Sequence, residues 1–465
     1  MTKPWSISTT VRNPERLRDF LRVLKKLEGQ NFDTANQIKY QVLLIKECIY
    51  KPQNIPIPYK KYYEQPEIEV PYNVAEEIFN LQKYKDPPMR GRQSVNPLNK
   101  LGFSIAREGY EPVIITELGN KFLSENYDVG YTFFKSMLKL QFPNPWSADF
   151  SEKEGFDIMP LIAVMKLIKN INGKAEKKGI NRKEFNLLVP TLINYKQIDE
   201  YTSRILELRK AKNKDDYIQH FVNKFYGTTT IPAKKMNNLF DYGDNILRYF
   251  RLTRYFKVSM GPLGNNWIID LEPSRKVEIE QLLDMYLGAS IKFETVTDYL
   301  KYLSDIEQPI LPWEKRENLE KVVQTLKLDA INLIMKEKLQ ISKEQQRFLD
   351  IDIHGLGKIQ LEQHNSQIRS LNLELKERIK KVKLMSDLNK VEEIISTLQN
   401  KKKLREYEPE QFEQLITEAL KIINDEILIK PNYPVDDDGE PVSHSPAHKP
   451  DIECYYKKFK AIIEV

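Results

Sequence analysis

Apolar residues in the first part of the chain recur at the three- and four-residue intervals of amphipathic helices. Residues 14–50 predict two such helices, and the first begins at Pro14, because proline fits the first turn of a helix. The first stripe contains Leu17, Phe20, Leu21, Leu24 and Leu27, and the second contains Ile38, Val42, Leu43 and Ile45. Residues 51–72, rich in Pro and Tyr, are expected to be extended, and residues 73–83 to form a third helix.

A helix, two short strands and another helix are predicted in residues 96–123. The elements lie at residues 96–102 (helix), 103–106 and 113–116 (strands) and 117–123 (helix). A tight turn joins the strands, and Thr116 is expected to cap the last helix. The preceding residues, 86–92 (Asp-Pro-Pro-Met-Arg-Gly-Arg), are expected to form a basic turn. This order of elements is the outline of a winged helix.

The same outline recurs in residues 235–283, with different residues. The elements lie at 242–253 (helix), 255–258 and 267–271 (strands) and from there to Leu283 (helix), with Gly261, Pro262 and Gly264 in the intervening turn. Between the two outlines, residues 155–215 are expected to be helical, with Asn181 as a helix cap.

The last third of the chain changes character. Residues 309–313 (Pro-Ile-Leu-Pro-Trp) predict a linker, and residues 317–400 predict long charged helices that suit a spacer or an antiparallel hairpin. After residue 408 the pattern gives a helix at 410–424, a polar loop at 435–439 and a pair of strands that ends at the last residue. The segments 1–150, 151–305, 306–405 and 406–465 are therefore expected to be separate parts.

Composition narrows the class of protein. A chain of 465 residues with 41% hydrophobic residues is expected to fold as two to four globular domains. No uninterrupted apolar run is long enough for a membrane helix, and the N-terminus does not resemble a signal peptide, so we expect a cytoplasmic protein. With only Cys48 and Cys454, neither a disulfide framework nor a cysteine-based zinc site is expected. The net charge of +6 favours polyanionic partners only mildly.

Two acidic residues near the end of the chain form the candidate chemical site. Asp451 follows Pro450, and Glu464 lies 13 positions later (464 − 451) in an apolar strand. Carboxylates at neighbouring strand ends can bind a divalent cation, which can activate water against a phosphodiester. Glu413, on the preceding helix, could supply a third carboxylate. The alternative is that all three are ordinary acidic residues on the surface.

Two nearby groups of polar residues are weaker candidates for metal ligands. Asp436, Asp437 and Asp438 lack the spaced ligands of a calcium loop, so we expect a solvated turn. His444 and His448 flank Pro446, but a zinc site would need two further ligands. We therefore favour a loop role or a contact with substrate phosphate for the two histidines.

Basic and amide residues in the two winged-helix outlines are candidate DNA contacts, because Arg pairs with guanine and Asn with adenine in the major groove. In the first outline they are Arg90, Arg92, Asn96, Asn99 and Lys100, and in the second Arg248, Arg251 and Arg254. The alternative is that they are surface charges. The two interpretations stay equal for the second group, because Arg248 and Arg251 alternate with the apolar Leu247 and Phe250.

Several short segments in a fixed order resemble one family, the AlwI-type restriction endonucleases, which include type IIS enzymes and BstNBI-type nicking endonucleases. The segments are residues 8–14, 27–29, 101–103, 115–119, 138–143, 248–251, 450–451 and 463–465. The resemblance implies a mainly α-helical fold with small β wings. Segments 1–150 and 151–305 would be winged-helix-like DNA-recognition subdomains, 306–405 a helical linker, and 406–465 the start of an α/β PD-(D/E)xK nuclease domain.

The resemblance also implies a function. The chain would be a bacterial cytoplasmic endonuclease, for restriction or nicking, that binds a short asymmetric site in double-stranded DNA and cuts outside it with Mg²⁺. Asp451, Glu464 and Glu413 match the family's metal-binding acids. Cleavage of both strands would need a second nuclease subunit or a transient dimer. The alternatives are a non-catalytic, sequence-specific DNA-binding protein and a helical scaffold without nucleic acid.

One departure from the family concerns the end of the chain. Members of the family continue beyond the strand that contains Glu464, whereas here Val465 is the last residue and the lysine position of the motif is absent. The resemblance therefore implies a C-terminally truncated chain. It is expected to be either a fragment of a longer enzyme or a naturally shortened protein that binds its site and cuts poorly or not at all.

Overall fold

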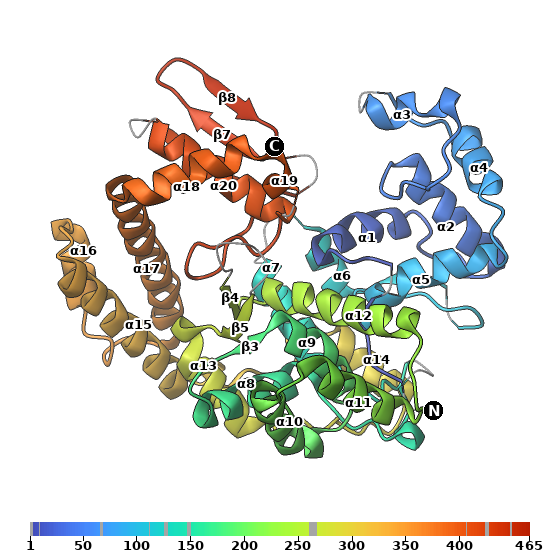
Figure 1. Ribbon diagram of the computed structural model, residues 1–465, viewed down its shortest axis with the longest axis horizontal. Helices are drawn as coiled ribbons and strands as arrows, with labels where there is room; N and C mark the ends of the chain where they lie inside the picture. Colours follow the sequence, from blue (N-terminus) through green and yellow to red (C-terminus); the bar gives the residue numbers. More distant parts are fainter. Residues whose placement is uncertain are drawn as a thin grey trace. The chain divides into compact units, whose positions relative to one another are not determined.

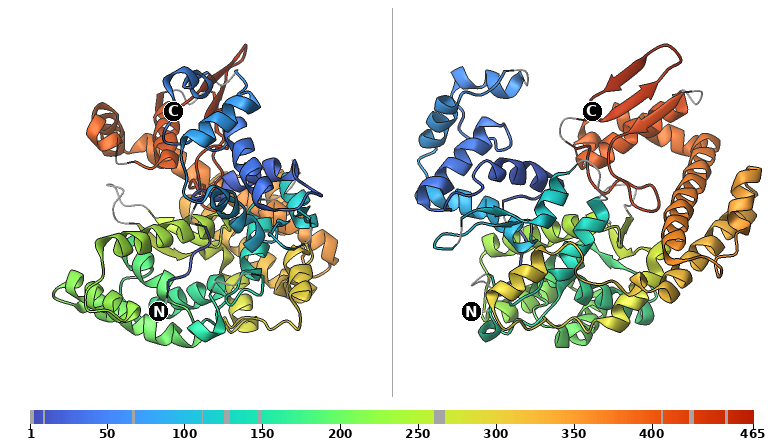
Figure 2. Two further views of the ribbon diagram at one scale, coloured as in Figure 1. Left: turned by 90° about the vertical axis from the view of Figure 1, so that its right-hand side faces the viewer. Right: turned by 180° about the vertical axis from the view of Figure 1, so that it is seen from behind.

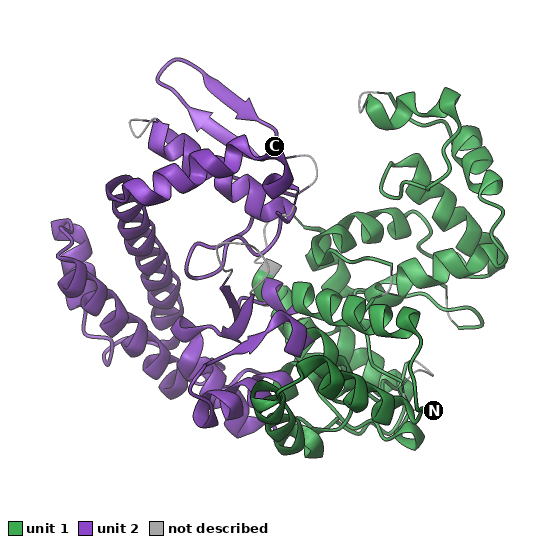
Figure 3. Cartoon of the chain, viewed as in Figure 1, with its two compact units in different colours: residues 1–163, 186–249, 288–309 green, residues 164–185, 250–287, 310–465 purple. Residues whose placement is uncertain are grey.

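The computed structural model is mainly helical, with small antiparallel sheets (Figure 1). It describes residues 3–8, 10–65, 68–110, 112–124, 129–146, 150–259, 267–405, 407–423, 427–446 and 449–465. The chain forms two compact units (Figure 3). Unit 1 contains residues 1–163, 186–249 and 288–309, and unit 2 contains residues 164–185, 250–287 and 310–465. These units are coarser than the four segments expected from the sequence, which stay a prediction.

The described elements of unit 1 are mostly helices. They are α1 (Leu17–Lys25), α2 (Thr34–Lys46), α3 (Lys61–Glu64), α4 (Tyr72–Leu81), α5 (Pro87–Lys100), β1 (Ser104–Ile105), β2 (Ile114–Ile115), α6 (Glu117–Leu123), α7 (Val129–Lys139), α10 (Ile198–Lys210), α11 (Lys214–Tyr226) and α14 (Val296–Ser304). Three helices contribute residues to both units. They are α8 (Pro160–Lys174), α9 (Arg182–Leu188) and α12 (Ala233–Leu252).

Unit 2 combines two small sheets with long helices. Its described elements are β3 (Ile180–Asn181), β4 (Phe256–Ser259), β5 (Ile268–Leu271), α13 (Lys276–Met285), α15 (Arg316–Glu337), α16 (Lys343–Asp350), α17 (Lys358–Ser386), α18 (Leu388–Gln399), α19 (Lys401–Leu404), α20 (Pro409–Ile423), β6 (Leu428–Pro431), β7 (Ile452–Tyr455) and β8 (Lys460–Ile463). Each sheet is formed by antiparallel neighbours, in the orders β3-β5-β4 and β6-β7-β8.

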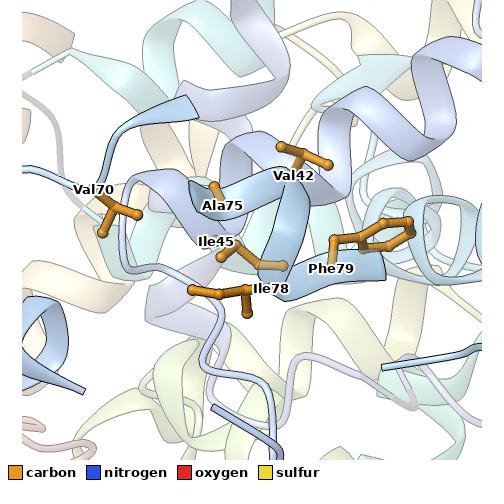
Figure 4. Close-up of a cluster of buried hydrophobic side chains, with 6 residues drawn as sticks. All are labelled: Val42, Ile45, Val70, Ala75, Ile78 and Phe79. Atoms are coloured by element: carbon orange, nitrogen blue, oxygen red, sulfur yellow. The ribbon is translucent and has the colours of Figure 1, made fainter. Parts of the chain in front are cut away.

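The first apolar stripe is buried as predicted, and the second is buried at Val42 and Ile45 but only half-buried at Ile38 and Leu43. All five apolar residues of the first stripe are almost completely buried. In the second helix, Val42 and Ile45 pack with Ala75, Ile78 and Phe79 of α4 (Figure 4). Helix α5 lies so close to α2 that a Cβ added at Gly91 would come within 2.2 Å of the Gln37 carbonyl oxygen. Only glycine allows this approach of the two backbones.

Helix α5 corrects one expectation from the sequence. Residues 86–92 were expected to form a basic turn before a short helix, but the helix begins at Pro87. Asp86 caps it by accepting a hydrogen bond of 3.2 Å from the backbone N–H of Met89. The two prolines that suggested a turn occupy the first turn of the helix, where no backbone N–H is needed.

The two helix–strand–strand–helix orders expected from the sequence are present. In unit 1, α5, β1, β2 and α6 follow one another, and Thr116 caps α6 by accepting a hydrogen bond from the N–H of Gly119 at 2.9 Å. In unit 2, β4 and β5 pair with Phe256 opposite Leu271. The sequence did not predict β3, which adds a third strand to this sheet. The expected turn at residues 261–264 lies outside the described residues.

Two long helices form the expected hairpin in unit 2. Helix α15 packs along α17, and the two lie side by side in Figures 1 and 2. Leu319, Val323, Ile353 and Leu361 form their common apolar cluster. The charged residues that dominate these helices in the sequence therefore surround a narrow buried seam.

Candidate functional site

The C-terminal strands have one face against a helix and one face without it. Ile416 and Leu420 of α20 pack on a cluster formed by Ile429, Ile452 and Cys454 of the sheet. Asp451 directly precedes Ile452, the first residue of β7. Helix α20 thus covers the sheet face formed by Ile429, Ile452 and Cys454, next to the start of β7.

The strand register brings the two predicted acids together. Ile452 pairs with Ile463, and one further step of this antiparallel register places Asp451 opposite Glu464. The backbone N–H of Val465 donates a hydrogen bond of 2.8 Å to the Asp451 carboxylate. Residues directly opposite each other in such a pair have Cβ atoms about 5 Å apart.

The third strand holds the backbone of this site. The N–H of Asn432 donates to the carbonyl oxygen of Asp451 at 2.9 Å. The Asn432 side-chain amide donates to the carbonyl oxygen of Pro450 at 2.8 Å. The proline–aspartate pair is therefore fixed from β6, a strand that the sequence did not predict.

Glu413 reaches the same region from α20. It is 6% exposed, and one of its oxygens accepts hydrogen bonds of 3.0 Å from both the N–H and the hydroxyl of Ser445. The Ser445 hydroxyl also lies 3.3 Å from the carbonyl oxygen of Asp451. Burial raises the pKa of Glu413 to about 7, and the charge of Asp451 contributes in the same direction against the hydrogen bonds from Ser445.

The three acids do not form a compact ligand cluster. Among the described residues, no group of three or more His, Cys, Asp or Glu side chains is placed to hold a metal ion. Asp451 and Glu464 flank the paired Ile452 and Ile463, and Ser445 lies between Glu413 and the Asp451 backbone. Of the two candidate histidines, His444 lies in the loop beside Ser445, and His448 lies outside the described residues.

The turn at residues 436–438 is confirmed, but its expected solvation is wrong. Asp437 pairs with Arg275 at 2.9 Å and with Arg369 at 3.3 Å. Asp438 pairs with Lys376 at 2.6 Å and also contacts Lys257. These cations come from β4, from the 3-10 turn just before α13 and from α17, so the acidic loop anchors the C-terminal sheet to the rest of unit 2.

Charge also explains how the acidic loop tolerates burial. Burial alone would raise the pKa of Asp437, but the guanidinium groups of Arg275 and Arg369 lower this pKa to about 2. Asp436 has a different role, because its carboxylate accepts hydrogen bonds of 2.9 Å from the N–H groups of Asp438 and Glu440. Asp437 therefore makes the ion pairs, and Asp436 shapes the turn.

Substitution of Asp437 by asparagine is expected to lower the free energy of unfolding at pH 7 by about 2–3 kcal/mol, since hydrogen bonds to charged groups are lost. The folded pKa of Asp437 is lowered from 3.8 to about 2, so its contribution is complete above pH 4 and disappears as the pH falls towards 2. Urea unfolding of parent and variant at several pH values measures this difference.

The matched control is Asp436→Asn, because asparagine keeps an oxygen for both N–H groups of the turn. Its effect at pH 7 is expected to stay below about 1 kcal/mol. Equal losses for the two variants would show that the ion pairs of Asp437 are not what anchors the loop.

The first group of predicted DNA contacts divides into internal and accessible residues. Asn99 is 8% exposed and its amide bonds the carbonyl oxygen of Ala106 at 2.8 Å. Lys100 is 3% exposed and donates to the carbonyl oxygen of Ser6 at 3.2 Å. Arg92 is exposed and pairs with Asp86, Arg90 lies over the Tyr84 ring, and Asn96 is half-buried. Asn99 and Lys100 thus hold unit 1 together, and the other three remain accessible.

The second group divides in the same way. Arg251 is 3% exposed and pairs at 3.1 Å with Glu410, which is 1% exposed. Arg251 also lies over the Trp267 ring and donates to the carbonyl oxygen of Pro441. Arg248, paired with Asp244 at 3.5 Å, and Arg254 are only half-buried. Arg251 therefore acts within the fold, where it ties α12 to α20.

The part of the chain that the structure describes contains no helix with the length and apolar character needed to span a membrane.

The chain was compared with curated proteins, solved structures and protein families. No curated protein matches the chain. One similar solved structure is the crystal structure of pyrene- and phenanthrene-modified DNA in complex with the BpuJ1 endonuclease binding domain. The match covers 66% of this chain and 97% of that chain, with 12% sequence identity and a TM-score of 0.39. The AlwI restriction endonuclease family matches residues 99–465, which include Glu413, Asp451 and Glu464. The chain therefore belongs to the AlwI restriction endonuclease family.

Proposed function

We propose that this chain is a type IIS-like, sequence-specific DNA endonuclease with a PD-(D/E)xK centre at Asp451, Glu464 and Glu413. The observation that carries the proposal is the register of β7 and β8, which sets Asp451 opposite Glu464 at the end of a sheet. A buried Glu413 nearby supplies a third carboxylate. Oxygen donors of this kind suit a hard divalent cation such as Mg²⁺.

The residues around the acids have defined tasks in this proposal. A bound Mg²⁺ would lower the pKa of an attacking water and stabilise the charge that develops on the phosphate. The Val465 N–H orients the Asp451 carboxylate, and Ser445 holds Glu413 by two hydrogen bonds. Asn432 fixes the backbone at Pro450. The protein thus pre-positions its oxygens before metal and DNA arrive.

DNA binding is assigned to the two helix–strand–strand–helix arrangements, which we propose are winged-helix-like. Arg90, Arg92, Asn96, Arg248 and Arg254 are the predicted contacts that retain accessible surface. Phosphate contacts from Arg and Lys would position the duplex, and contacts with base edges would specify the site. Cleavage of both strands needs two centres, so a second nuclease subunit or a transient dimer would complete it.

A specific observation favours the alternative of a non-catalytic, sequence-specific DNA-binding protein. The described residues contain no compact group of three metal-ligating side chains. The two proposals differ in a single result, which is cleavage of DNA when Mg²⁺ is present.

The deciding experiment incubates the chain with plasmid DNA in Mg²⁺ and, in parallel, in EDTA. Discrete nicks or fragments in Mg²⁺ alone support the endonuclease. Salt-dependent binding to duplex DNA without any cleavage supports the non-catalytic protein instead. The absence of both binding and cleavage would contradict each proposal.

Metal binding is expected to depend on pH through Glu413. Because burial raises its pKa to about 7, this carboxyl must lose a proton to bind a cation, so the affinity for Ca²⁺ or Mg²⁺ should rise with pH through neutrality. Without metal, stability should change with pH in the opposite direction to metal affinity. The free energy of unfolding should fall as the pH rises from 4.5 towards 7, because the folded state holds the Glu413 proton more tightly than the unfolded state. Calorimetric titration with Ca²⁺, without DNA, measures the affinity and the released proton.

The variant Glu413→Gln should remove this pH dependence. Glu418→Gln, on the same helix, is the matched control, because Glu418 is near Lys390, at 3.8 Å, rather than Asp451. Its Ca²⁺ affinity should keep the parental dependence on pH. An unchanged profile in Glu413→Gln would mean that Glu413 is not a ligand.

A further inference from the structure

A two-lobed groove lies along helix α5 in unit 1. One lobe, of about 350 Å³, extends towards Arg107 and Trp146, and the other, of about 470 Å³, towards Lys3 and Asn238. Gln93 and Asn96 line both lobes. We call these two neighbouring lobes, which share Gln93, Asn96 and Lys100 as lining residues, the α5 groove.

The amides of Gln93 and Asn96 are available to a ligand. Both side chains are half-buried, and neither has a hydrogen-bond partner in the described part of the chain. Asn99, on the next turn of α5, differs, because it donates to the Ala106 carbonyl at 2.8 Å and accepts from the Ser104 hydroxyl at 2.8 Å. Asn99 therefore supports the fold, whereas the amides of Gln93 and Asn96 keep their donors and acceptors open to the groove.

Positive charge surrounds these amides. The side chains that line the groove include Arg92 and Arg107 in the first lobe and Lys3 and Lys235 in the second. The lining acid is Glu108, which accepts a hydrogen bond from Gln37 at 3.1 Å. Such an excess of cations favours the binding of a polyanion. If the polyanion is DNA, contacts between its phosphates and these cations would place its bases beside the groove.

We propose that the α5 groove is a base-reading site in which Gln93 and Asn96 each bind the major-groove edge of an adenine. This inference rests on the proposed DNA-binding function. A side-chain amide can accept a hydrogen bond from adenine N6 and donate one to N7, a bidentate pairing that no other base offers.

The spacing along the helix suits two neighbouring base pairs. Gln93 and Asn96 are three residues apart, which corresponds to a rise of about 4.5 Å along a helix. Base pairs in duplex DNA are spaced by about 3.4 Å. The two amides can therefore contact consecutive pairs when α5 lies in the major groove.

Asn238 of α12 borders the second lobe from the opposite side. It is half-buried, and its side chain also has no hydrogen-bond partner among the described residues. The neighbouring Asn237 is exposed and lines neither lobe. Asn237 is therefore a suitable control residue, since it is an asparagine just outside the groove.

The test is selection of binding sequences from a randomised duplex library by the full chain. The parent is expected to enrich a sequence with two neighbouring A·T pairs. Gln93→Ala and Asn96→Ala should each lose the preference at one of these positions by about 10- to 100-fold. The salt dependence of binding to random DNA should stay parental, because phosphate contacts are unchanged.

Two further variants sharpen the result. Asn96→Asp should change the preference at its position from adenine to cytosine, since a carboxylate accepts from cytosine N4. Asn237→Ala should enrich the parental sequence. Circular dichroism and thermal melting confirm that each variant folds.

Parental sequence preference in Gln93→Ala, Asn96→Ala and Asn96→Asp alike would overturn the base-reading site while leaving the DNA-binding proposal intact. If the parent itself bound duplex DNA without any sequence preference, the base-reading site would fall and a binder without specificity would remain. Failure of the parent to bind duplex DNA would overturn the proposed function and, with it, this inference.

Discussion

Substitution of Asp451 by asparagine is expected to reduce Mg²⁺-dependent DNA cleavage on the order of a thousandfold. Metal-assisted charge stabilisation is worth several kcal/mol, and each ~1.36 kcal/mol corresponds to a factor of ten in rate. Asparagine keeps an oxygen that can accept from the Val465 N–H, so the local backbone should persist. The cleavage rate of plasmid DNA under single-turnover conditions measures the effect.

The same strand supplies the control for this experiment. Glu453, in β7 and two residues after Asp451, pairs with Lys460 at 2.8 Å. Glu453→Gln should cleave DNA at the parental rate. DNA affinity of Asp451→Asn should not fall, because the change removes a negative charge from the protein. If Asp451→Asn cleaved as fast as the parent, the proposed centre would be wrong.

Substitution of Arg251 by alanine is expected to lower the free energy of unfolding by about 3–5 kcal/mol, because it leaves the buried Glu410 carboxylate without its partner. The pair is almost completely buried, and Oε2 of Glu410 has no hydrogen-bond partner in the described structure, so little else offsets the loss. The contact with the Trp267 ring is lost as well. Denaturant unfolding at pH 7 measures this difference.

Arg248 is the matched control, since it lies one turn earlier on the same helix. Its pairing with Asp244 is partly exposed, at 3.5 Å, and pairs of this kind contribute about 0.3–0.5 kcal/mol. Arg248→Ala should therefore unfold almost like the parent while binding DNA more weakly. A small loss for Arg251→Ala would mean that water enters and solvates Glu410.

Helical periodicity allowed much of the fold to be predicted. The stripe from Leu17 to Leu27 is buried as expected, and the predicted helix caps at Thr116 and Asn181 are present. Short-range patterns identify such features because the residues that decide them are neighbours in sequence. Helix α5 was underestimated because its prolines and glycine suggested a turn, whereas tight packing on α2 requires that glycine.

The candidate site could be predicted only in part. Asp451 and Glu464 are close because two adjacent strands form a hairpin, a local arrangement that the sequence pattern indicates. Strand β6 was missed because 20 residues, 432–451, separate it from β7, and no local signal gives that pairing. The availability of Gln93, three residues before the predicted contact Asn96, likewise depends on tertiary packing rather than on residue type.

Long-range charge pairing explains the remaining differences. Arg251 lies 159 residues before Glu410, and Asp437 lies 162 residues after Arg275. Residue type and spacing cannot reveal which cation a carboxylate will meet across such separations. Solvation of the acidic loop and surface exposure of Arg251 were reasonable expectations that only the tertiary structure could correct.

The anchoring of α20 has a consequence for protein engineering. Glu410 and Glu413 are one helical turn apart, so the partner of Arg251 also sets the rotation of the helix that presents Glu413. In a chimaera, the residues from Tyr407 onwards would be replaced by the equivalent segment of another endonuclease. The acidic residues of the new segment would then have to pair with Arg251, Arg275 and Arg369 of this chain. We expect such a chimaera to fold only when Arg251, Arg275 and Arg369 are exchanged together with the segment, or when the new segment has acidic residues at the positions that pair with them.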